Sequence, residues 1–133
     1  VADLAVLQPV SDLHGLAPLQ LGQPVAGSVV AILVHEADGP RLVPAGLEFL
    51  IRATGADVYG GSADGRDAMV LSAGVLTGHS GAAVVDHTGR VVGVTFSRAR
   101  GGSPVAYAVQ VSALQSLLEH AQNSPEPAGP CID

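Results

Sequence analysis

Six short apolar runs separated by glycine, proline and aspartate constrain the fold of this chain more than any other feature. The runs are rich in valine, isoleucine and leucine, and the polar, glycine-rich stretch 55–67 is expected to be a loop between two of them. We expect strands at residues 27–35, 41–54, 68–72, 81–85, 90–97 and 104–111, the second of them bent or interrupted. Short strands joined by turn residues are typical of antiparallel sheets that close on themselves. The sequence therefore predicts an all-β protein, an antiparallel six-stranded barrel over residues 28–111.

The region before the barrel is expected to have two parts. Residues 1–10 are interpreted as a short strand whose apolar run holds one acid, Asp3. A strand with no earlier neighbour leaves a row of backbone groups unpaired, so we expect natural sequence before Val1. Residues 11–27 hold several prolines and glycines among scattered polar residues, and they are interpreted as a linker.

The region after the barrel changes to helical spacing. Ser112 and Gln115 form a capping-box pattern, and the apolar residues that follow fall on one helical face. A C-terminal helix is therefore expected within residues 112–122. The proline-rich residues 123–133 are expected to form a flexible tail that holds Cys131.

Composition restricts the classes of function. A length of 133 residues requires one domain or part of one. All six basic residues are arginine and the formal net charge is −6, so no basic stripe is present to bind nucleic acid. No run of 18 apolar residues and no signal-peptide pattern occurs. The single cysteine, Cys131, cannot form a disulfide within the chain, and no cysteine and histidine spacing suggests a metal site.

The most distinctive short motif is a serine between two glycines, in the sequence Gly78-His79-Ser80-Gly81. Flanking glycines let the backbone turn tightly and leave the serine hydroxyl uncovered. They also let successive N–H groups point into one concavity, as an oxyanion hole requires. In a chain with 17 glycines the same pattern also fits an ordinary hairpin loop, so the motif alone leaves both interpretations open.

The order of several motifs resembles the second half of a trypsin-like serine protease with the chymotrypsin double-barrel fold. Asp3-Leu4-Ala5-Val6-Leu7 is similar to the motif around the triad aspartate, and residues 78–81 are similar to the nucleophile loop. Residues 93–97 resemble the strand that lines the substrate cleft, and residues 105–109 resemble the strand behind the specificity pocket. The resemblance implies that this is the second, Greek-key barrel, that residues 1–10 belong to the first barrel, and that an interdomain linker joins them.

A narrower resemblance is to the actinobacterial membrane-anchored proteases of the periplasmic acid-resistance type. It rests on residues 56–67 and on the tail ending at Cys131. This group implies an extracytoplasmic location, periplasmic or in the cell envelope, with a membrane anchor in segments absent from this sequence. It also implies a disulfide from Cys131 back to the upstream N-terminal barrel.

The resemblance implies a role for several residues. Ser80 is the nucleophile, Asp3 orients the base histidine, and the N–H groups of Gly78 and Ser80 form the oxyanion hole. Gly74 lies at the base of the specificity pocket. With no acid there, the expected preference is a small or medium apolar side chain, not arginine or lysine. An extended peptide substrate is expected to meet the backbone of Thr95, Phe96 and Ser97.

The base histidine is missing from the implied triad. The family's histidine lies upstream of the aspartate motif, and no histidine of this chain matches that motif: His14, His35, His79, His87 and His120. His79 replaces an acid or amide usually found before the nucleophile, which argues against activation by a new N-terminus. It is either a tolerated substitution or a group that titrates beside the oxyanion hole and changes activity with pH.

The predicted function is that of a serine endopeptidase acting through an acyl-enzyme, with this chain as the C-terminal fragment that carries the serine and the aspartate. The alternative is a catalytically inactive binding or regulatory module, which is favoured by His79 and by Ala82 and Ala83 in place of the family's Gly-Pro. The expected partners are a peptide or protein substrate and the upstream barrel. No cofactor and no metal is expected.

Overall fold

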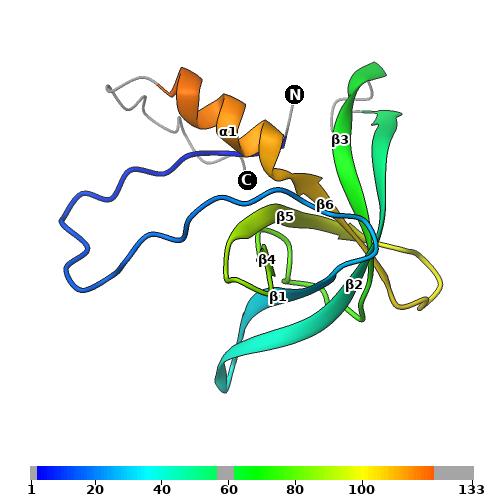
Figure 1. The fold of residues 1–133 in the computed structure, drawn as a ribbon, viewed down its shortest axis with the longest axis horizontal. Helices are drawn as coiled ribbons and strands as arrows, with labels where there is room; N and C mark the ends of the chain where they lie inside the picture. The colour runs from blue at the N-terminus through cyan, green and yellow to red at the C-terminus, as the bar shows by residue number, and fades with distance from the viewer. Residues whose placement is uncertain (1–2, 57–61, 122–133) are drawn as a thin grey trace, which may run out of the picture.

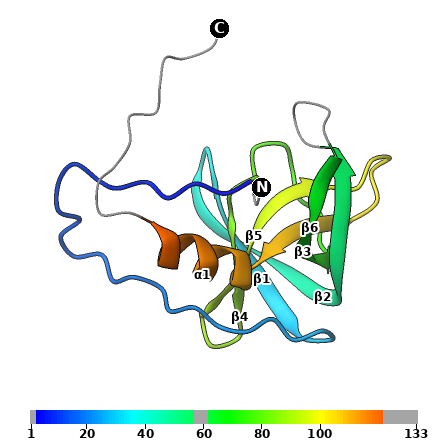
Figure 2. The same cartoon turned by 90° about the horizontal axis from the view of Figure 1, so that it is seen from above.

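Six antiparallel strands close into a barrel that is followed directly by one helix (Figures 1 and 2). The computed structural model describes residues 3–56 and 62–121. The elements are β1 (Val29–Glu36), β2 (Gly39–Ala56), β3 (Ser62–Ser72), β4 (Ala83–Asp86), β5 (Val91–Arg98), β6 (Val105–Gln110) and α1 (Val111–His120). Their order around the barrel is β1-β2-β3-β6-β5-β4, and the exchange of β4 and β6 after β3 is a Greek-key order. The expected six-stranded antiparallel barrel with a C-terminal helix is confirmed.

The core of the barrel is aliphatic. Side chains alternate between the two faces of a strand, so every second residue of β1 points inward: Val30, Ile32 and Val34. The largest fully buried side chains are Ile32, Leu47, Met69, Leu71, Val84, Val92, Val109 and Val111. A chain without tryptophan and with two phenylalanines fills its interior in this way.

Strand β2 is long and bent, as expected, but it is not interrupted. It pairs with β1 from Gly39 to Gly46 and with β3 from Gly46 onward, so it exchanges partners at Gly46. The loop expected over residues 55–67 is mostly strand, because β2 and β3 continue as a ribbon in which Ala56 pairs with Ser62. Tyr59, placed in that loop by the sequence, lies outside the described residues.

The strand expected over residues 1–10 is not present in the described residues 3–10. No neighbouring strand accepts their backbone hydrogen bonds, and the apolar side chains after Leu4 are exposed, with Leu7 89% exposed. Residues 11–27 are irregular, as expected of a linker, and touch the barrel where Leu21 pairs with Val91. In both views this segment begins on the side of the molecule where α1 lies and then crosses to the start of β1 (Figures 1 and 2).

The helix begins two residues earlier than the capping box predicts, at Val111 and not at Ala113. Gln110 is the N-cap and makes no capping hydrogen bond, because its side-chain amide donates to the Ala68 carbonyl at 2.8 Å. Val111 is buried at 1% exposure and places the first turn against the barrel, so Ser112 lies inside the helix and does not cap it. Tertiary packing, not the capping pattern, sets this boundary. Cys131 lies outside the described residues, and no helix within those residues is long and apolar enough to cross a membrane.

Candidate active site

The segment between β3 and β4 folds into two consecutive turns that share His79. The His79 N–H donates to the Leu76 carbonyl at 3.2 Å, and the Ala82 N–H donates to the His79 carbonyl at 3.1 Å. Gly78 and Gly81 stand third in the two turns, with φ of +100° and +89°. A positive φ at this position is the type II pattern and favours glycine. The two glycines of the motif are therefore required by the backbone path.

Ser80 stands second in the second turn, and its side chain is exposed. Its hydroxyl donates to the Phe96 carbonyl at 3.4 Å, a long and weak hydrogen bond that leaves Oγ available for other contacts. The hydroxyl lies on a pocket of about 240 Å³ between the serine loop and the end of β5. The pocket is lined by Val75, Leu76, Thr77, Gly78, His79, Ser80, Thr95, Phe96, Ser97 and Arg98.

Within residues 76–81, three backbone N–H groups have no protein acceptor in the described part of the chain, those of Thr77, Gly78 and Ser80. The alternating residues His79 and Gly81 both donate to carbonyls, so their N–H groups are turned away. All three residues line the pocket, and Gly78 and Ser80 are the two that flank His79. Two preorganised N–H donors beside an exposed hydroxyl are the arrangement that stabilises a tetrahedral oxyanion in acyl transfer.

Strand β5 forms the opposite wall and is tied to the serine loop through Thr95. The Gly81 N–H donates to the Thr95 carbonyl at 2.8 Å, and the Thr95 N–H donates to the Ala82 carbonyl at 2.9 Å. Thr95 thus lines the pocket, and its main-chain N–H and carbonyl both hold the serine loop in place. The register of β5 against β6 shifts between Thr95 and Ser97, at Phe96.

The two remaining sequence-predicted residues lie outside the pocket lining. The Asp3 carboxylate is 3.4 Å from Nη1 of Arg66, and the Arg66 guanidinium lies 4.7 Å from the ring centre of Phe96. Asp3 is therefore linked to the edge of the pocket through two side chains. Gly74 is exposed, and a Cβ built on it would meet no atom within 4 Å, so it does not form the floor of this pocket.

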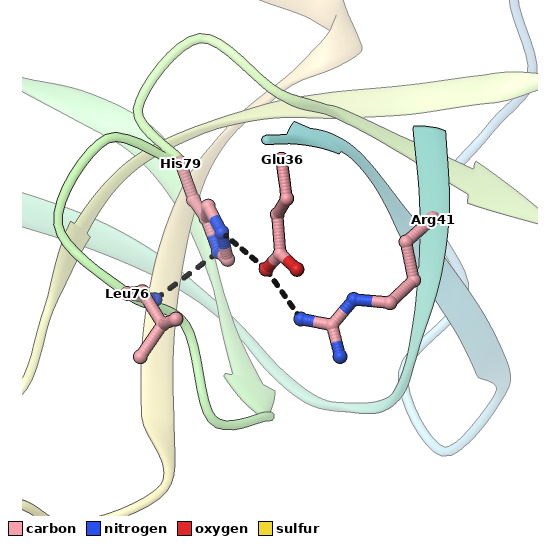
Figure 3. Close-up of polar contacts among 4 residues, drawn as sticks. All are labelled: Glu36, Arg41, Leu76 and His79. Carbon is pink, nitrogen blue, oxygen red and sulfur yellow. Dashed lines mark hydrogen bonds and ion pairs between the residues drawn. The ribbon is translucent and has the colours of Figure 1, made fainter. Parts of the chain in front are cut away.

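His79 is the buried polar residue of the site, and it is 6% exposed. Nδ1 accepts the Leu76 N–H at 3.1 Å, so Nδ1 carries no proton and Nε2 carries it. Nε2 donates to Glu36 Oε1 at 3.2 Å, and the same carboxylate oxygen is paired with Arg41 (Figure 3). Glu36 directly follows the strand expected at residues 27–35, and the sequence alone assigned it no role. The available signal was His79 itself, because a histidine in a packed loop requires polar partners.

No described histidine is placed to accept the Ser80 proton. Both ring nitrogens of His79 are already bonded, and His120 bonds the Ser116 carbonyl at the end of α1. The other three histidines are exposed and do not line the pocket: His14, His35 and His87. Within residues 3–56 and 62–121 no cluster of three metal-ligating side chains occurs either.

Ala82 does not crowd the serine. Its side chain is half-buried and packs against the core cluster of the barrel, and Ala83 opens β4 beside it. Ala82, the first of the two alanines that replace the family's Gly-Pro, is therefore accommodated on the core side of the loop. This removes one of the reasons for expecting an inactive module.

Comparisons with known proteins agree on the fold. The family model described as a trypsin-like peptidase domain matches residues 1–94. The structure is similar to the Rv3671c protease from M. tuberculosis in its active form, at 26% identity and a TM-score of 0.76 over 91% of this chain and 56% of that one.

Two further solved structures show the fold alone. The HtrA-type protease AlgW with tripeptide is 24% identical, with a TM-score of 0.59 over 83% of this chain and 38% of that one. The serine endoprotease from Yersinia pestis is 16% identical, with a TM-score of 0.60 over 82% and 37% of the two chains. The chain thus spans little more than half the length of the M. tuberculosis protease, and the comparison with curated proteins gives no match.

Proposed function

The chain belongs to the family of trypsin-like peptidase domains, and from this premise we propose that it is the C-terminal barrel of a serine endopeptidase whose nucleophile is Ser80. The observation that carries the proposal is the pairing of an exposed hydroxyl with two free N–H donors on one pocket. The proposal is supported by the hydrogen-bond pattern of residues 78–81, in which the Gly78 and Ser80 N–H groups stay free while those of His79 and Gly81 are bonded.

In the proposed reaction Ser80 Oγ attacks the carbonyl carbon of a peptide bond while a histidine takes the hydroxyl proton. The N–H groups of Gly78 and Ser80 receive the oxyanion, and each such donor contributes about 10²–10³ in rate. The histidine then gives the proton to the leaving amine, which leaves an acyl-serine. Water attacks the acyl-serine in the second half of the reaction and restores the hydroxyl.

We propose that the base histidine comes from an upstream barrel, with Asp3 as the residue that orients it. The occupied ring of His79 and the exposed positions of the other histidines support a base from outside the described residues. The Asp3 side chain is 65% exposed on the side of the pocket where Arg66 meets Phe96, so its carboxylate is accessible to a further donor. The 56% coverage of the M. tuberculosis protease supports the same assignment.

The proposed substrate is a peptide or protein with a non-basic side chain at the cleavage site. Arg98 is the permanently charged residue among those lining the pocket, and a cation there repels arginine and lysine. The apolar faces of Val75, Leu76 and Phe96 suit a small or medium apolar side chain. The preference proposed earlier from Gly74 is thus supported by other residues.

We also propose that the protein belongs to the actinobacterial membrane-anchored group and acts outside the cytoplasm. The support is the similarity to the M. tuberculosis protease and the position of Cys131 in the tail. A disulfide from Cys131 to the upstream barrel closes a long loop and stabilises by roughly 4–5 kcal/mol in the chain-entropy model. Peptide mapping of the longer natural protein under non-reducing conditions tests it, since the Cys131 peptide must then migrate with a second cysteine peptide.

Fluorophosphonate labelling of the longer natural protein tests the catalytic proposal, with Ser80→Ala as the control. Labelling that disappears in Ser80→Ala is the expected result. Absence of labelling at both neutral and acid pH contradicts the proposal and supports an inactive binding module instead. The 133-residue chain alone is expected to retain a rate enhancement of at most about 10³–10⁴ over the uncatalysed reaction. This is the activity that remains when one member of a catalytic triad is removed.

A further inference from the structure

We propose that Glu36 and Arg41, at the far end of the β1–β2 hairpin, are positioning residues that hold the Ser80 loop in its reactive shape by acting through His79. The expected effect on catalysis rests on the proposed function of Ser80. The claim that Glu36 and Arg41 hold the loop in shape rests on the hydrogen bonds of His79 alone, and it holds whether or not the protein is catalytic. Figure 3 shows the Glu36 carboxylate between the His79 ring and the Arg41 guanidinium.

His79 controls the loop because both turns pass through it. Its N–H and its carbonyl close the first and the second turn, on Leu76 and Ala82. Its ring adds a second bond to Leu76 through Nδ1, so the first turn is closed at both main-chain groups of that residue. The free N–H groups that flank His79 on either side are aimed by these bonds. A shift of His79 therefore moves the proposed nucleophile and both proposed oxyanion donors together.

Glu36 selects the form of the His79 ring that closes the loop. A carboxylate can only accept, so the contact at 3.2 Å requires a proton on Nε2. That leaves Nδ1 of a neutral ring as an acceptor for the Leu76 N–H. Without Glu36, the proton is free to sit on Nδ1, where it would face the Leu76 N–H and open the first turn. The tautomer is set by the partner of the other nitrogen, as in other buried histidines.

Arg41 fixes Glu36 in turn. Its guanidinium pairs with Oε1, the same oxygen that accepts from His79, and the two residues lie on paired strands of one hairpin. Charge-assisted hydrogen bonds of this kind are shorter and stronger than neutral ones. The Glu36 side chain is 25% exposed and that of Arg41 is 52% exposed, so removing this pair changes global stability little. The expected effect is local to residues 76–82.

The first measurement is the second-order rate of fluorophosphonate labelling in the longer natural protein. Glu36→Ala is expected to lower it about tenfold or more, since a small displacement of reacting groups lowers rates strongly. Glu36→Gln keeps an oxygen that accepts from Nε2 and is expected to stay within about threefold of wild type. Arg41→Ala is expected to fall between the two. Arg52→Ala removes a comparable exposed ion pair, with Asp67, and is expected to leave the rate unchanged.

The second measurement is amide hydrogen exchange in the same variants, read at residues 76–82 and at the barrel strands. Glu36→Ala is expected to speed exchange of the Leu76 and Ala82 amides while the strands keep wild-type protection. Should Glu36→Ala fail to fold, Arg41→Ala is compared with Arg52→Ala by the same measurement. Wild-type labelling and wild-type exchange in Glu36→Ala and Arg41→Ala would overturn the inference and leave the proposed function intact. Absence of labelling in the wild type would defeat the proposed function, and the exchange data would still decide whether Glu36 positions the loop.

Discussion

The imidazole Nδ1 of His79 accepts the backbone N–H of Leu76 at 3.1 Å, while the backbone N–H of His79 donates to the Leu76 carbonyl at 3.2 Å. The two residues are thus joined in both directions. This reciprocal pair closes the turn before Ser80 without any contribution from the serine. The serine hydroxyl is left exposed because its neighbour carries the hydrogen bonds that hold the loop.

Replacing His79 by alanine is expected to lower the free energy of unfolding of the chain by about 1–3 kcal/mol, because the Leu76 N–H loses its buried acceptor. His79→Asn is expected to lose less, since its amide oxygen can accept that N–H while it no longer reaches Glu36. Urea denaturation of the 133-residue chain measures both. His87→Ala, in the exposed β4–β5 turn, is the control and should stay within about 0.5 kcal/mol of wild type. Equal stability of His79→Ala and His87→Ala would contradict the role of the reciprocal pair.

The barrel was predictable because its determinants are local. Runs of valine, isoleucine and leucine bounded by glycine and aspartate mark the strands, and the turn at residues 86–89 joins β4 and β5 as expected. The glycines around Ser80 were also readable, since a positive φ has a residue preference. These features depend on neighbours in sequence, which a single sequence displays.

The remaining features depend on contacts between residues distant in sequence. Glu36 lies 43 residues before His79, and no periodicity in the chain reports their contact. Residues 3–10 have an apolar pattern typical of a strand, yet a strand forms only beside a partner. The start of α1 is likewise set by the burial of Val111 against the barrel, which overrides the capping pattern at Ser112.

Alanine substitutions at the glycines of the serine loop are expected to destabilise the chain through backbone strain and not through steric clash of the added Cβ. Gly78→Ala and Gly81→Ala place a Cβ on residues with φ of +100° and +89°, which costs about 1–2 kcal/mol each. No atom lies within 4 Å of an added Cβ at either position, so the loss reflects conformation alone. Gly74→Ala, equally open but without a positive φ, is the matched control and should be nearly neutral. The measurement is the midpoint temperature of thermal unfolding. Equal midpoints in all three variants would contradict the role of the positive φ.

Gly93→Ala is expected to destabilise the barrel by overpacking, by about 1–3 kcal/mol. An added Cβ on this β5 residue would lie 2.6 Å from the Met69 methyl carbon and 2.6 Å from the Val109 carbonyl oxygen. The methionine end can move, but the carbonyl belongs to the adjacent strand and cannot. Gly93→Ala is therefore expected to destabilise a Met69→Ala background as well, measured by a double-mutant cycle. Full recovery of stability in that background would show that the methionine alone caused the clash.

Arg98→Glu is expected to change the cleavage preference of the longer natural protein toward basic side chains. The guanidinium lines the pocket, and reversing its charge replaces repulsion of lysine and arginine with attraction. The ratio of cleavage rates for a lysine-containing and a leucine-containing peptide should rise about tenfold, which corresponds to about 1.4 kcal/mol. Arg100→Glu makes the same change of net charge in the loop after β5, outside the pocket lining. A similar shift in both variants would assign the preference to net charge and not to the pocket.

Asp86 is expected to make the barrel sensitive to acid through the turn between β4 and β5. Its carboxylate accepts the hydroxyl of Thr88 at 2.7 Å, the N–H of Thr88 at 2.8 Å and the N–H of Arg90 at 3.1 Å. The hydroxyl bond above all, and then the Arg90 N–H, lower the pKa of Asp86 below its usual value of 3.8. Because the folded pKa is the lower one, the stabilisation is present at neutral pH and is lost as the pH falls below about 3.8 through the folded value.

The test is the slope of unfolding free energy against pH below about pH 4, measured by urea denaturation. Asp86→Asn keeps an oxygen that accepts the turn N–H groups but has no proton to gain, so its slope is expected to be smaller than that of wild type. Thr88→Val removes the hydroxyl that contributes most to the shift, and its slope is expected to lie between the two. Identical slopes in wild type and Asp86→Asn would show that other carboxylates, not this turn, account for the acid sensitivity of the barrel.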